Sequence, residues 1–442
     1  MEGERVGGFG LRLPLEGIRV LANTYTWAGP YAGMILADMG AEVILIESTQ
    51  RWQWNTRGFM ARPSKALVAT LGSIGGAYVD KDPGERPWNR HAMFNSAARN
   101  KYSFTVDLLK PEGVEIVRRL ASISDVLIEN STPGVMDKLG VGYEALRQVK
   151  PDLVFVSSSG MGARGPFAGH RGFGTQMEDL SGFTWLRAYP DGEPTDTPMT
   201  NHSDASAGAG IVLAVMHALA HRNRTGEGQW VDCSQSEKLI NQVGEVVMDY
   251  TMNGRVEGTL GNRHRSMAPH GAYPCAGQDK WIAIAVSSDR QWEALKGLMG
   301  SPTWAEDRRF RTSLGRWKNQ DDLDKGISEW TRRQSHQELF LRCQAAGVPA
   351  GALCDEAEIS KDPQLWARDF FVPITSPEAG THLHVGPLWQ SSSVQFAVRK
   401  PDVRLGEDNA FVYKEVLGVA EETYGRLERE GHIGMDYVPH VT

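Results

Sequence analysis

The sequence predicts an α/β fold, in which a doubly wound layer of parallel strands and helices is joined to a smaller α+β domain. Apolar, β-branched runs of strand length alternate with segments of helical spacing through residues 17–160. After Gln229 the chain becomes more polar, then rich in turns, and then largely helical. Its 442 residues correspond to roughly two to three domains of about 150 residues each.

The first β-α-β unit opens the patterned part of the chain. Residues 17–23, GIRVLAN, are apolar and β-branched, as expected for a buried strand. Residues 29–40 follow with helical spacing of their apolar side chains and end at a glycine. Residues 41–47, AEVILIE, form the next buried strand. Because a helix joins the two strands, we expect them to be parallel, with a right-handed crossover.

The same alternation continues beyond this unit. The predicted elements are a helix at 110–123, a strand at 125–130, a capped helix start at 131–140 with Pro133 in its first turn, a helix at 143–151 and a strand at 153–160. Regular alternation of this kind is typical of a doubly wound α/β layer.

The second half of the chain predicts a different organisation. A polar helix follows 229–237, and then come a turn-rich stretch at 253–274, a strand at 280–288, a mainly helical segment at 289–347 and a helical pair at 405–433. The predicted domains are a large domain at 1–230, a linker helix with a small α+β domain at 231–375, and a C-terminal segment at 376–442 that returns to the large domain.

Composition excludes several classes of protein. The net charge of -7 argues against nucleic acid as a partner, because phosphate binding needs clustered Lys and Arg. The N-terminus lacks a basic and then apolar signal, and the apolar run at 205–220 is too short to span a bilayer, so we expect neither export nor a membrane. Widely spaced cysteines predict free thiols in a reducing cytoplasm: Cys233, Cys275, Cys343 and Cys354.

Two cofactor motifs are incomplete. The loop after the first strand reads NTYTWAGP, without the glycines of a dinucleotide site. A G-x-G-x-x-G pattern at residues 160–165 is followed by PFAGHRGFG, which cannot open a helix, so we expect neither nicotinamide nor flavin. His217 and His221 have zinc spacing, but no nearby third ligand accompanies them, and we expect no metal site.

Asp204 stands where a long apolar helix begins. Ser203 or Asp204 would be a good helix cap, because a side-chain oxygen can accept the free N–H groups of the first turn. Small residues follow, including Gly208 and Gly210, and glycine inside a helix costs roughly 0.5–1 kcal/mol relative to alanine. Close approach of another backbone, or room for a bulky ligand, would explain them. From the residues alone, a simple cap and a functional carboxylate both remain open.

Seven segments in register identify a resemblance that covers nearly the whole chain. The chain resembles the class III CoA-transferases, the family that contains formyl-CoA transferase, carnitine CoA-transferase and α-methylacyl-CoA racemase. The segments are LEGIRVL…WAGPYAGMILADMGAEVILIE, ARNKYSFTVDLLKPEG, SDVLIENSTPGVMDKLGVGYEAL, PDLVFVSSSGMGARGPFA, HSDASAGAG…HRNRTGEGQWVDCS, GNRHRSMAPHGAYP and AGVPAGALCDEAEISKDPQLWARDFF. The resemblance implies a Rossmann-like large domain built from both chain ends, a small domain and an interlocked dimer, either of two copies or with a related second subunit.

The resemblance also implies a reaction. Asp204 matches the family's catalytic nucleophile, which attacks an acyl-CoA thioester to give a mixed anhydride and CoA thiolate. A small organic acid then exchanges onto the anhydride, and the thiolate releases the new thioester. Acyl-CoA and the acid are substrates, and no tightly bound cofactor is expected. An isomerase or racemase of the same family and a CoA-binding partner subunit are the alternatives.

The CoA contacts implied by the resemblance carry over in part. The matching positions are Thr26, Trp27, Ala28, Val106, Asn130, Ser131, Thr132 and Lys138. A basic residue often found after the second strand is Ser48 here, and a lysine of some members is Leu109, beside Lys110. Arg99 and Lys101 are expected to compensate, although a solvated surface charge explains either residue equally well.

Two departures from the family pattern affect the site. The family's G-H-D or G-Y-D segment reads Gly172-Phe173-Gly174, and we expect Phe173 and Gly174 to contact substrate. Because the racemase branch uses the missing His, and neither His170 nor His202 is in register, the change argues against racemisation. The segment 48–91 is long and carries Trp52, Trp54 and Trp88. It is either an elaboration packed on the dimer or a wall of an acyl pocket.

Overall fold

The chain forms two compact units. The computed structural model describes residues 12–72, 75–198 and 200–442. The first unit contains the chain up to Ser181 together with Thr200–Gly244 and Ala367–Thr442, and the second contains Gly182–Met199 and Glu245–Trp366. The first unit therefore uses both ends of the chain.

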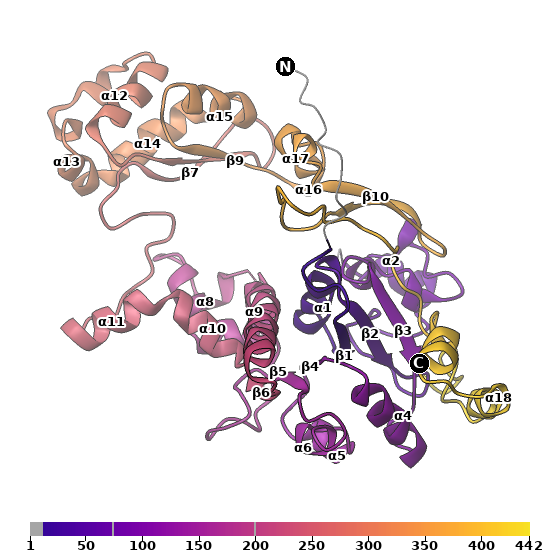
Figure 1. Cartoon of the computed structure of the whole chain (residues 1–442). Coiled ribbons are helices and arrows are strands. Elements are labelled where there is room, and N and C mark those ends of the chain that lie inside the picture. Colours follow the sequence, from indigo (N-terminus) through magenta and orange to yellow (C-terminus); the bar gives the residue numbers. More distant parts are fainter. Residues whose placement is uncertain (1–11, 73–74, 199) are drawn as a thin grey trace. The chain divides into compact units, whose positions relative to one another are not determined.

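A six-stranded parallel sheet forms the centre of the first unit (Figure 1). Its strands are β1 (Arg19–Asn23), β2 (Glu42–Glu47), β3 (Lys101–Thr105), β4 (Val126–Glu129), β5 (Val154–Ser157) and β6 (Gln229–Asp232). Their order is β3-β2-β1-β4-β5-β6, with Val20 of β1 facing both Val43 of β2 and Val126 of β4. The chain adds β2 and β3 on one side of β1 and then β4, β5 and β6 on the other side. The strand order therefore reverses between the neighbouring strands β1 and β4. The predicted parallel β-α-β unit is confirmed.

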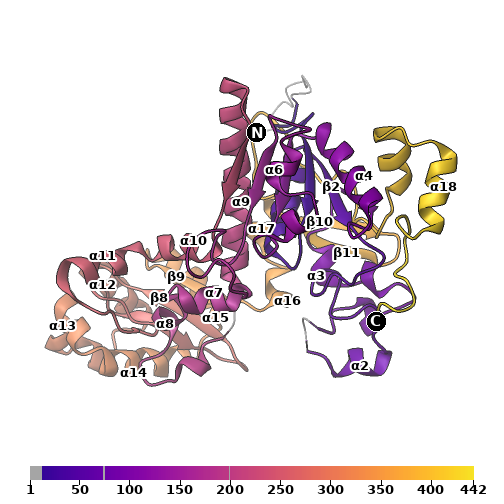
Figure 2. The same ribbon diagram turned by 90° about the horizontal axis from the view of Figure 1, so that it is seen from below.

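Helices cover both faces of this sheet, and two separate hydrophobic cores result. Helices α1 (Ala28–Asp38) and α9 (His202–Thr225) pack on one face, where Val20, Val43 and Val126 point. On the other face Leu21, Ile44 and Leu127 meet α4 (Pro111–Ser122), the π-helical turn Phe411–Val416 and α18 (Glu421–Arg429). Figure 2 shows α9 on one side of the sheet and α4 and α18 on the other. Neighbouring strand residues point to opposite faces, so a continuous apolar run serves both cores.

The glycines of α9 are explained by close packing. A Cβ on Gly208 would lie 2.7 Å from a ring carbon of Tyr31 and 2.9 Å from the carbonyl oxygen of Ala28 on α1. A Cβ on Gly210 would lie 2.4 Å from Lys238 on α10 (Gln235–Gln242). Of the two explanations that the sequence left open, close approach of another backbone accounts for Gly208, whereas Gly210 meets only the end of a lysine side chain.

Helix α9 is also the one described helix that is long and apolar enough to cross a membrane. It is longer than the apolar run in the sequence suggested, since it has 24 residues. Half of its apolar window is buried inside the structure, and Ile211, Val215 and Leu219 belong to the first core. A core helix has these properties, so length and composition are weak evidence for a membrane span.

The segment 48–91 is irregular and packs largely on the C-terminal residues. It contains α2 (Lys65–Thr70) and the short 3₁₀ turns Val79–Lys81 and Pro87–Asn89, and α3 (Ala92–Asn95) follows it. Trp88 is buried against Tyr437, with ring centroids 5.2 Å apart, and Trp52 approaches the same ring at 5.1 Å. Trp88 is therefore structural, and Trp52 packs on the same C-terminal ring.

The remaining elements of the first unit are short. They are α5 (Val135–Lys138), α6 (Tyr143–Leu146), α7 (Gly174–Leu180), and the antiparallel pair β10 (Phe371–Ser376) and β11 (Gly380–Val385). The predicted helix start at 131–140 and the predicted helix at 143–151 are thus only single turns. Pro133 lies before α5, which begins after Gly134 in a left-handed conformation.

The second unit is a small α+β assembly. Its antiparallel sheet has the order β7-β8-β9, and its elements are α8 (Phe183–Arg187), α11 (Gly244–Asn253), β7 (His270–Pro274), β8 (Trp281–Ala285), α12 (Asp289–Leu298), α13 (Ser313–Lys318), α14 (Gln320–Thr331), α15 (His336–Ala345), β9 (Ala350–Leu353), α16 (Glu356–Ile359) and α17 (Pro363–Ala367). Trp292, Leu323 and Leu339 bring the helices together in one core. The predicted strand at 280–288 and the helical segment at 289–347 are confirmed.

Candidate functional site

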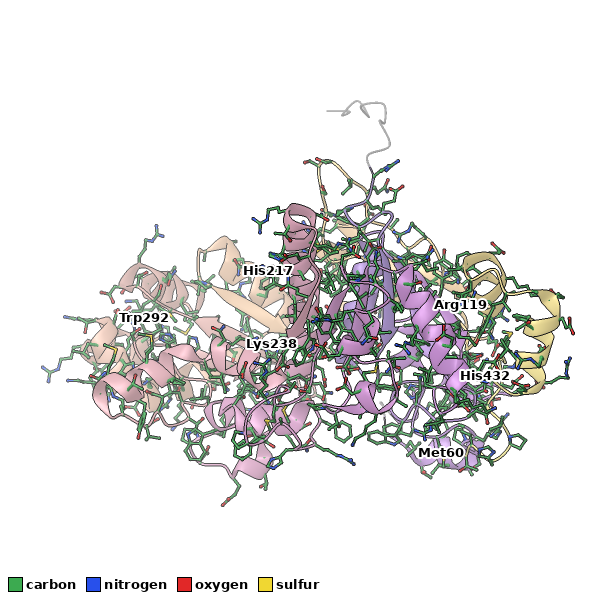
Figure 3. All side chains as sticks on the ribbon, turned by 60° about the horizontal axis from the view of Figure 1, so that its bottom comes forward. Met60, Arg119, His217, Lys238, Trp292 and His432 are labelled. Carbon is green, nitrogen blue, oxygen red and sulfur yellow. The ribbon has the colours of Figure 1, made fainter. Side chains whose placement is uncertain are left out.

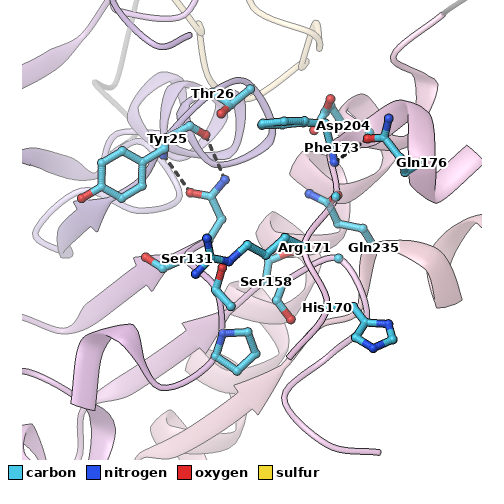
Figure 4. Close-up of a pocket in the computed structure, with 17 residues that line it drawn as sticks. Tyr25, Thr26, Ser131, Ser158, His170, Arg171, Phe173, Gln176, Asp204 and Gln235 are labelled. Atoms are coloured by element: carbon cyan, nitrogen blue, oxygen red, sulfur yellow. Dashed lines mark hydrogen bonds between the residues drawn. The ribbon is translucent and has the colours of Figure 1, made fainter. Parts of the chain in front are cut away.

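A cavity of about 590 Å³ lies within the first unit, where β1, β4 and β5 end (Figure 4). Ligands of open α/β sheets bind outside the carboxyl ends of the strands, at the point where the strand order reverses. The lining residues come from the loops after these strands, from the segment before α7, and from α7, α9 and α10. They are Tyr25, Thr26, Asn130, Ser131, Thr132, Pro133, Ser158, Ser159, Gly160, His170, Arg171, Gly172, Phe173, Gly174, Gln176, Asp204 and Gln235.

Asp204 does not cap helix α9. The helix begins at His202, and its N-cap is Asn201, which adopts a left-handed conformation with φ of 52°. The backbone N–H of Ser203 donates instead to the Glu178 carboxylate of α7, at 3.2 Å. The capping interpretation is therefore wrong for both Ser203 and Asp204, because another helix supplies the cap. Among the described residues, no hydrogen-bond donor reaches the Asp204 carboxylate, which lines the cavity.

The surroundings of Asp204 make its carboxylate unusually basic. The residue is 8% exposed, and burial, followed by the nearby negative charge of Glu178, raises its pKa to about 6. Both causes disfavour the charged form of the carboxylate. At neutral pH the Asp204 carboxylate is still mostly ionised.

Gly174 gives the Asp204 carboxylate its space. A Cβ on Gly174 would lie 2.4 Å from Oδ2 of Asp204 and 2.4 Å from Oγ of Ser203. Any larger residue at this position would displace the first turn of α9 or the carboxylate itself. Gly174 replaces the acidic residue of the family motif, and the Asp204 carboxylate occupies the space that a side chain at this position would need.

Phe173 lines the cavity and also contacts the segment 48–91. Its backbone N–H donates to the side chain of Gln176 at 2.8 Å, which fixes the start of α7. Its ring is half exposed and lies 5.2 Å from the ring of Trp54. Trp54 therefore contacts a wall residue, although no described residue of 48–91 lines this cavity itself. Trp88 fits the interpretation as packed structure, and Trp52 lines a second cavity.

The loop after β1 is held in a single conformation at the cavity. The Asn130 side chain accepts a hydrogen bond from the N–H of Tyr25 at 2.8 Å and donates to its carbonyl at 2.9 Å. Thr26 has a positive φ of 64°, and its N–H donates to Thr56 at 2.7 Å. Because a positive φ is unfavourable for threonine, these bonds are what keep the Thr26 backbone facing the cavity.

The structure brings together six of the sequence-predicted contact residues with Asp204. They are Thr26, Asn130, Ser131, Thr132, Phe173 and Gly174. Trp27 stacks on Tyr31 at 4.8 Å, and Ala28 is buried at the start of α1, so neither lines this cavity. Lys138 is exposed on α5, and it also lies outside the cavity lining.

Val106 lines a second, adjacent cavity of about 250 Å³. This cavity lies beyond the ends of β1, β2 and β3 and shares Tyr25 with the first. Arg51 also lines it and has no ion-pair partner among the described residues. Ser48 occupies the position where the family often has a basic residue. Arg51, three residues later, places a positive charge in this region instead.

The expectation that Arg99 and Lys101 replace missing phosphate contacts is wrong. Both side chains are fully buried. Arg99 pairs with Asp38 at 2.7 Å and donates to the carbonyl of Val385. Lys101 donates to the carbonyl of Pro30 at 2.6 Å, and burial lowers its pKa to about 7. A solvated phosphate cannot reach either group, so both act inside the fold.

Several residues of the cavity were not predicted from the sequence. Ser158 and Ser159 follow β5, and their buried hydroxyl groups have no hydrogen-bond partner among the described residues. The rule that ligands meet the carboxyl ends of parallel strands could have identified them. Arg171 and Gln235 come from a loop and a helix that carry no such signal.

One group of described residues has side chains close enough to share a metal ion: Glu112, Glu430 and His432. Arg426 already donates to both carboxylates, at 2.9 Å to each. The His432 Nδ1 accepts the N–H of Asp107 at 3.3 Å. We interpret the group as an ion-pair network. Figure 3 shows His217, from the zinc-spaced pair, well apart from His432.

The parallel sheet carries a cavity at the ends of its strands with a buried carboxylate on it, and comparison with known proteins gives the class of this α/β protein. Residues 15–409 match the model of CoA-transferase family III, and the chain belongs to this family. It is therefore an enzyme of the CoA-transferase class.

Three relatives illustrate the similarity. The chain is 30% identical to succinyl-CoA–D-citramalate CoA-transferase of Chloroflexus aurantiacus, over 94% of this chain and 97% of the relative. It is 32% identical to succinate–glutarate CoA-transferase of Agrobacterium fabrum, over 91% and 96%. A CAIB/BAIF family protein from Brucella suis has a similar crystal structure, with a TM-score of 0.80 and 30% identity, over 92% of this chain and 100% of that one.

Proposed function

We propose that the protein moves CoA from an acyl-CoA donor to an organic dicarboxylic acid, with Asp204 as the nucleophile. The observation that carries this proposal is the Asp204 carboxylate itself, which is buried, basic, free of hydrogen-bond donors from the described residues and positioned on a cavity. A carboxylate that is neither paired nor capping has no structural role in this place.

The proposed reaction conserves the energy of the acyl bond. An oxygen of Asp204 attacks the thioester carbonyl, the C–S bond breaks, and CoA leaves as a thiolate, which gives an aspartyl–acyl anhydride. The acceptor carboxylate attacks the aspartyl carbonyl, and the donor acid leaves. The thiolate then attacks the acceptor carbonyl, releasing the new acyl-CoA and the Asp204 carboxylate. No water or proton is consumed, so the site must exclude water.

The two adjacent cavities support a placement for CoA. We place the acyl end near Asp204 and the nucleotide end in the second cavity, with Tyr25 between them. Arg51 would then offer its unpaired charge to a phosphate. In this proposal CoA thioesters bind only as substrates, and the enzyme holds no tightly bound cofactor. The interlocked dimer, of identical or related subunits, and a cytoplasmic location belong to the same proposal.

A dicarboxylic acceptor is supported by Arg171 and by the relatives' substrates. The two relatives act on D-citramalate and glutarate, as their names state. Arg171 lines the cavity and has no ion-pair partner among the described residues. Figure 4 shows its side chain extending toward Ser131. Its guanidinium can bind a distal carboxylate with two hydrogen bonds, and Ser158 and Ser159 offer further donors.

A covalent adduct tests the function directly. We expect the enzyme, incubated with succinyl-CoA and then with hydroxylamine, to carry a hydroxamate on the Asp204 peptide, because an anhydride is cleaved by this amine. Peptide mass spectrometry is the measurement, and enzyme incubated with free CoA is the control. Wild-type enzyme that transfers CoA to none of a panel of carboxylic acids would contradict the proposed function.

Arg171→Gln is expected to weaken the use of dicarboxylic acids selectively. The loss of a charge-assisted hydrogen bond of about 1.5–3 kcal/mol should raise the KM for glutarate by roughly 10- to 100-fold. The KM for valerate, a monocarboxylic acid of the same chain length, should stay within about twofold. Arg171→Lys keeps the charge and should give an intermediate KM. Equal effects on both acids would assign Arg171 to CoA binding instead.

One observation favours a second candidate function. His170 lines the same cavity as Asp204, although the family motif places its histidine at another position. A histidine and a carboxylate could transfer a proton at the α-carbon of a bound acyl-CoA. Exchange of the α-proton with deuterated solvent, in the absence of any acceptor acid, would support this isomerase activity. No exchange is expected from the transferase.

A further inference from the structure

Glu178 of α7 contacts the N-terminal end of α9, the end that carries Asp204. Its side chain is 1% exposed and does not line the cavity. One carboxylate oxygen accepts the N–H of Ser203 at 3.2 Å, and the other accepts the hydroxyl of Thr200 at 3.0 Å. Glu178 therefore fixes the residue on the N-terminal side of Asp204 while remaining out of reach of a substrate.

The position of Glu178 is related to the departure at Gly174. Residues four apart on a helix lie on the same face, so Glu178 is one turn beyond Gly174 on the face of α7 directed at α9. The motif that the chain resembles has an acidic residue at the position of Gly174, where a Cβ would lie 2.4 Å from Asp204. Here the carboxylate comes from the following turn, on a longer side chain.

We propose that Glu178 is a positioning residue that holds the first turn of α9 and, through its negative charge, drives Asp204 to attack the thioester. This role rests on the proposed function of Asp204 as the nucleophile. Glu178 acts through Ser203 and Asp204 and touches no reacting atom, so its effect is electrostatic and geometric.

The physical basis is relief of repulsion. Two carboxylates held close together in a buried site repel each other, and the charge of Glu178 adds to burial in raising the pKa of Asp204 to about 6. When Asp204 attacks, its negative charge passes to the departing thiolate and the repulsion falls. An interaction that is unfavourable before the transition state and weaker within it accelerates the step.

Other charged groups near Asp204 are differently placed. His170 and Arg171 line the open side of the cavity. His202, in the same helical turn, bonds to the side chain of Gln242 at 2.8 Å. Lys238 of α10 lies against Gly210, beyond the first turn of α9. After burial, Glu178 is the cause that raises the pKa of Asp204.

Glu178→Gln tests this role, since the amide oxygen can still accept the N–H of Ser203. We expect the acidic limb of the pH profile of kcat/KM, with half-maximal activity near pH 6, to move about half a pH unit or more toward acid. At pH 8 kcat should fall by about three- to tenfold, whereas the KM for acyl-CoA should change little.

Asp179→Asn is the matched control, because it removes the same charge from the neighbouring, exposed position of α7. Its pH profile should match that of the wild type. A purely structural Glu178 would lower the melting temperature without moving the acidic limb, and an unmoved limb in folded Glu178→Gln would overturn the proposal.

A second measurement does not depend on activity. Unfolding of wild type, Glu178→Gln, Asp204→Asn and the double variant at pH 8 should be non-additive, because either neutral residue removes the same repulsion. The non-additivity should disappear near pH 4, where Asp204 is protonated in the folded protein. Additive effects at both pH values would contradict coupling of the two carboxylates. If Asp204→Asn retained full activity, the proposed function would fail, whatever the coupling.

Discussion

Asp204→Asn is expected to lower the rate of CoA transfer by roughly 10³- to 10⁶-fold, the range seen when a covalent nucleophile is removed from an enzyme. Asparagine has nearly the same size and can occupy the same space beside Gly174, but its neutral amide is a poor nucleophile toward a thioester. The measurement is transfer from succinyl-CoA to glutarate, followed by chromatography of the CoA esters. The hydroxamate on the Asp204 peptide should disappear with the activity.

The same variant should be more stable than the wild type, which separates lost chemistry from lost structure. The folded protein holds the Asp204 proton more tightly than the unfolded chain, because its pKa is raised from 3.8 to about 6. Folding stability is therefore lost as pH rises through this window. Asparagine avoids this loss, which corresponds to about 3 kcal/mol above pH 7. The difference between the two unfolding free energies should vanish below about pH 4.

Two results would contradict the role of Asp204. Retention of most of the transfer activity by a folded Asp204→Asn protein would exclude the residue as nucleophile. A variant that is less stable than wild type at pH 8 and equally less stable at pH 4 would show that the carboxylate supports the fold, which is incompatible with its lack of donors. Active enzyme with no trapped adduct, in contrast, would point to direct transfer between substrates.

The fold was predictable where strands are buried on both faces. Residues 17–23 and 41–47 are continuous apolar runs, and a continuous run is the pattern of a central parallel strand. Strand β3 was not predicted, because KYSFT has polar residues at three of five positions. Those side chains are buried, and the backbone N–H groups of Ser103 and Thr105 donate to Asp408 and Asn409, about 300 positions further along. No local pattern reports such partners.

The site could be predicted at residues that belong to a family motif. It could not be predicted where a residue's role depends on whether its side chain is buried or exposed. Asp204 could be identified by resemblance, but its cap could not, because Glu178 comes from a different helix. Arg99 and Lys101 have the composition of a phosphate site, yet the structure buries both. Charge is visible in a sequence and solvent exposure is not. Arg171 reaches the cavity from a loop without periodicity, which explains why it was missed.

Gly174→Ala is expected to lower kcat/KM for CoA transfer by about 100-fold, because displacement of a catalytic group by about 1 Å has an effect of this size. The added Cβ would lie 2.4 Å from both the Asp204 carboxylate and the Ser203 hydroxyl, so one or both must move. The change does not act through α7 itself, since alanine is a better helix former than glycine by about 1 kcal/mol. The measurement is steady-state transfer together with the yield of trapped adduct.

Gly169→Ala is the matched control, because it places the same methyl group into open space in the segment that leads to α7. It should retain near wild-type activity, and both variants should show the circular dichroism of the folded protein. If Gly174→Ala were as active as Gly169→Ala, the Asp204 carboxylate could tolerate displacement. In that case, the attack of Asp204 on the thioester would not require glycine at position 174. Comparison of the two variants therefore tests whether CoA transfer requires the observed position of the Asp204 carboxylate.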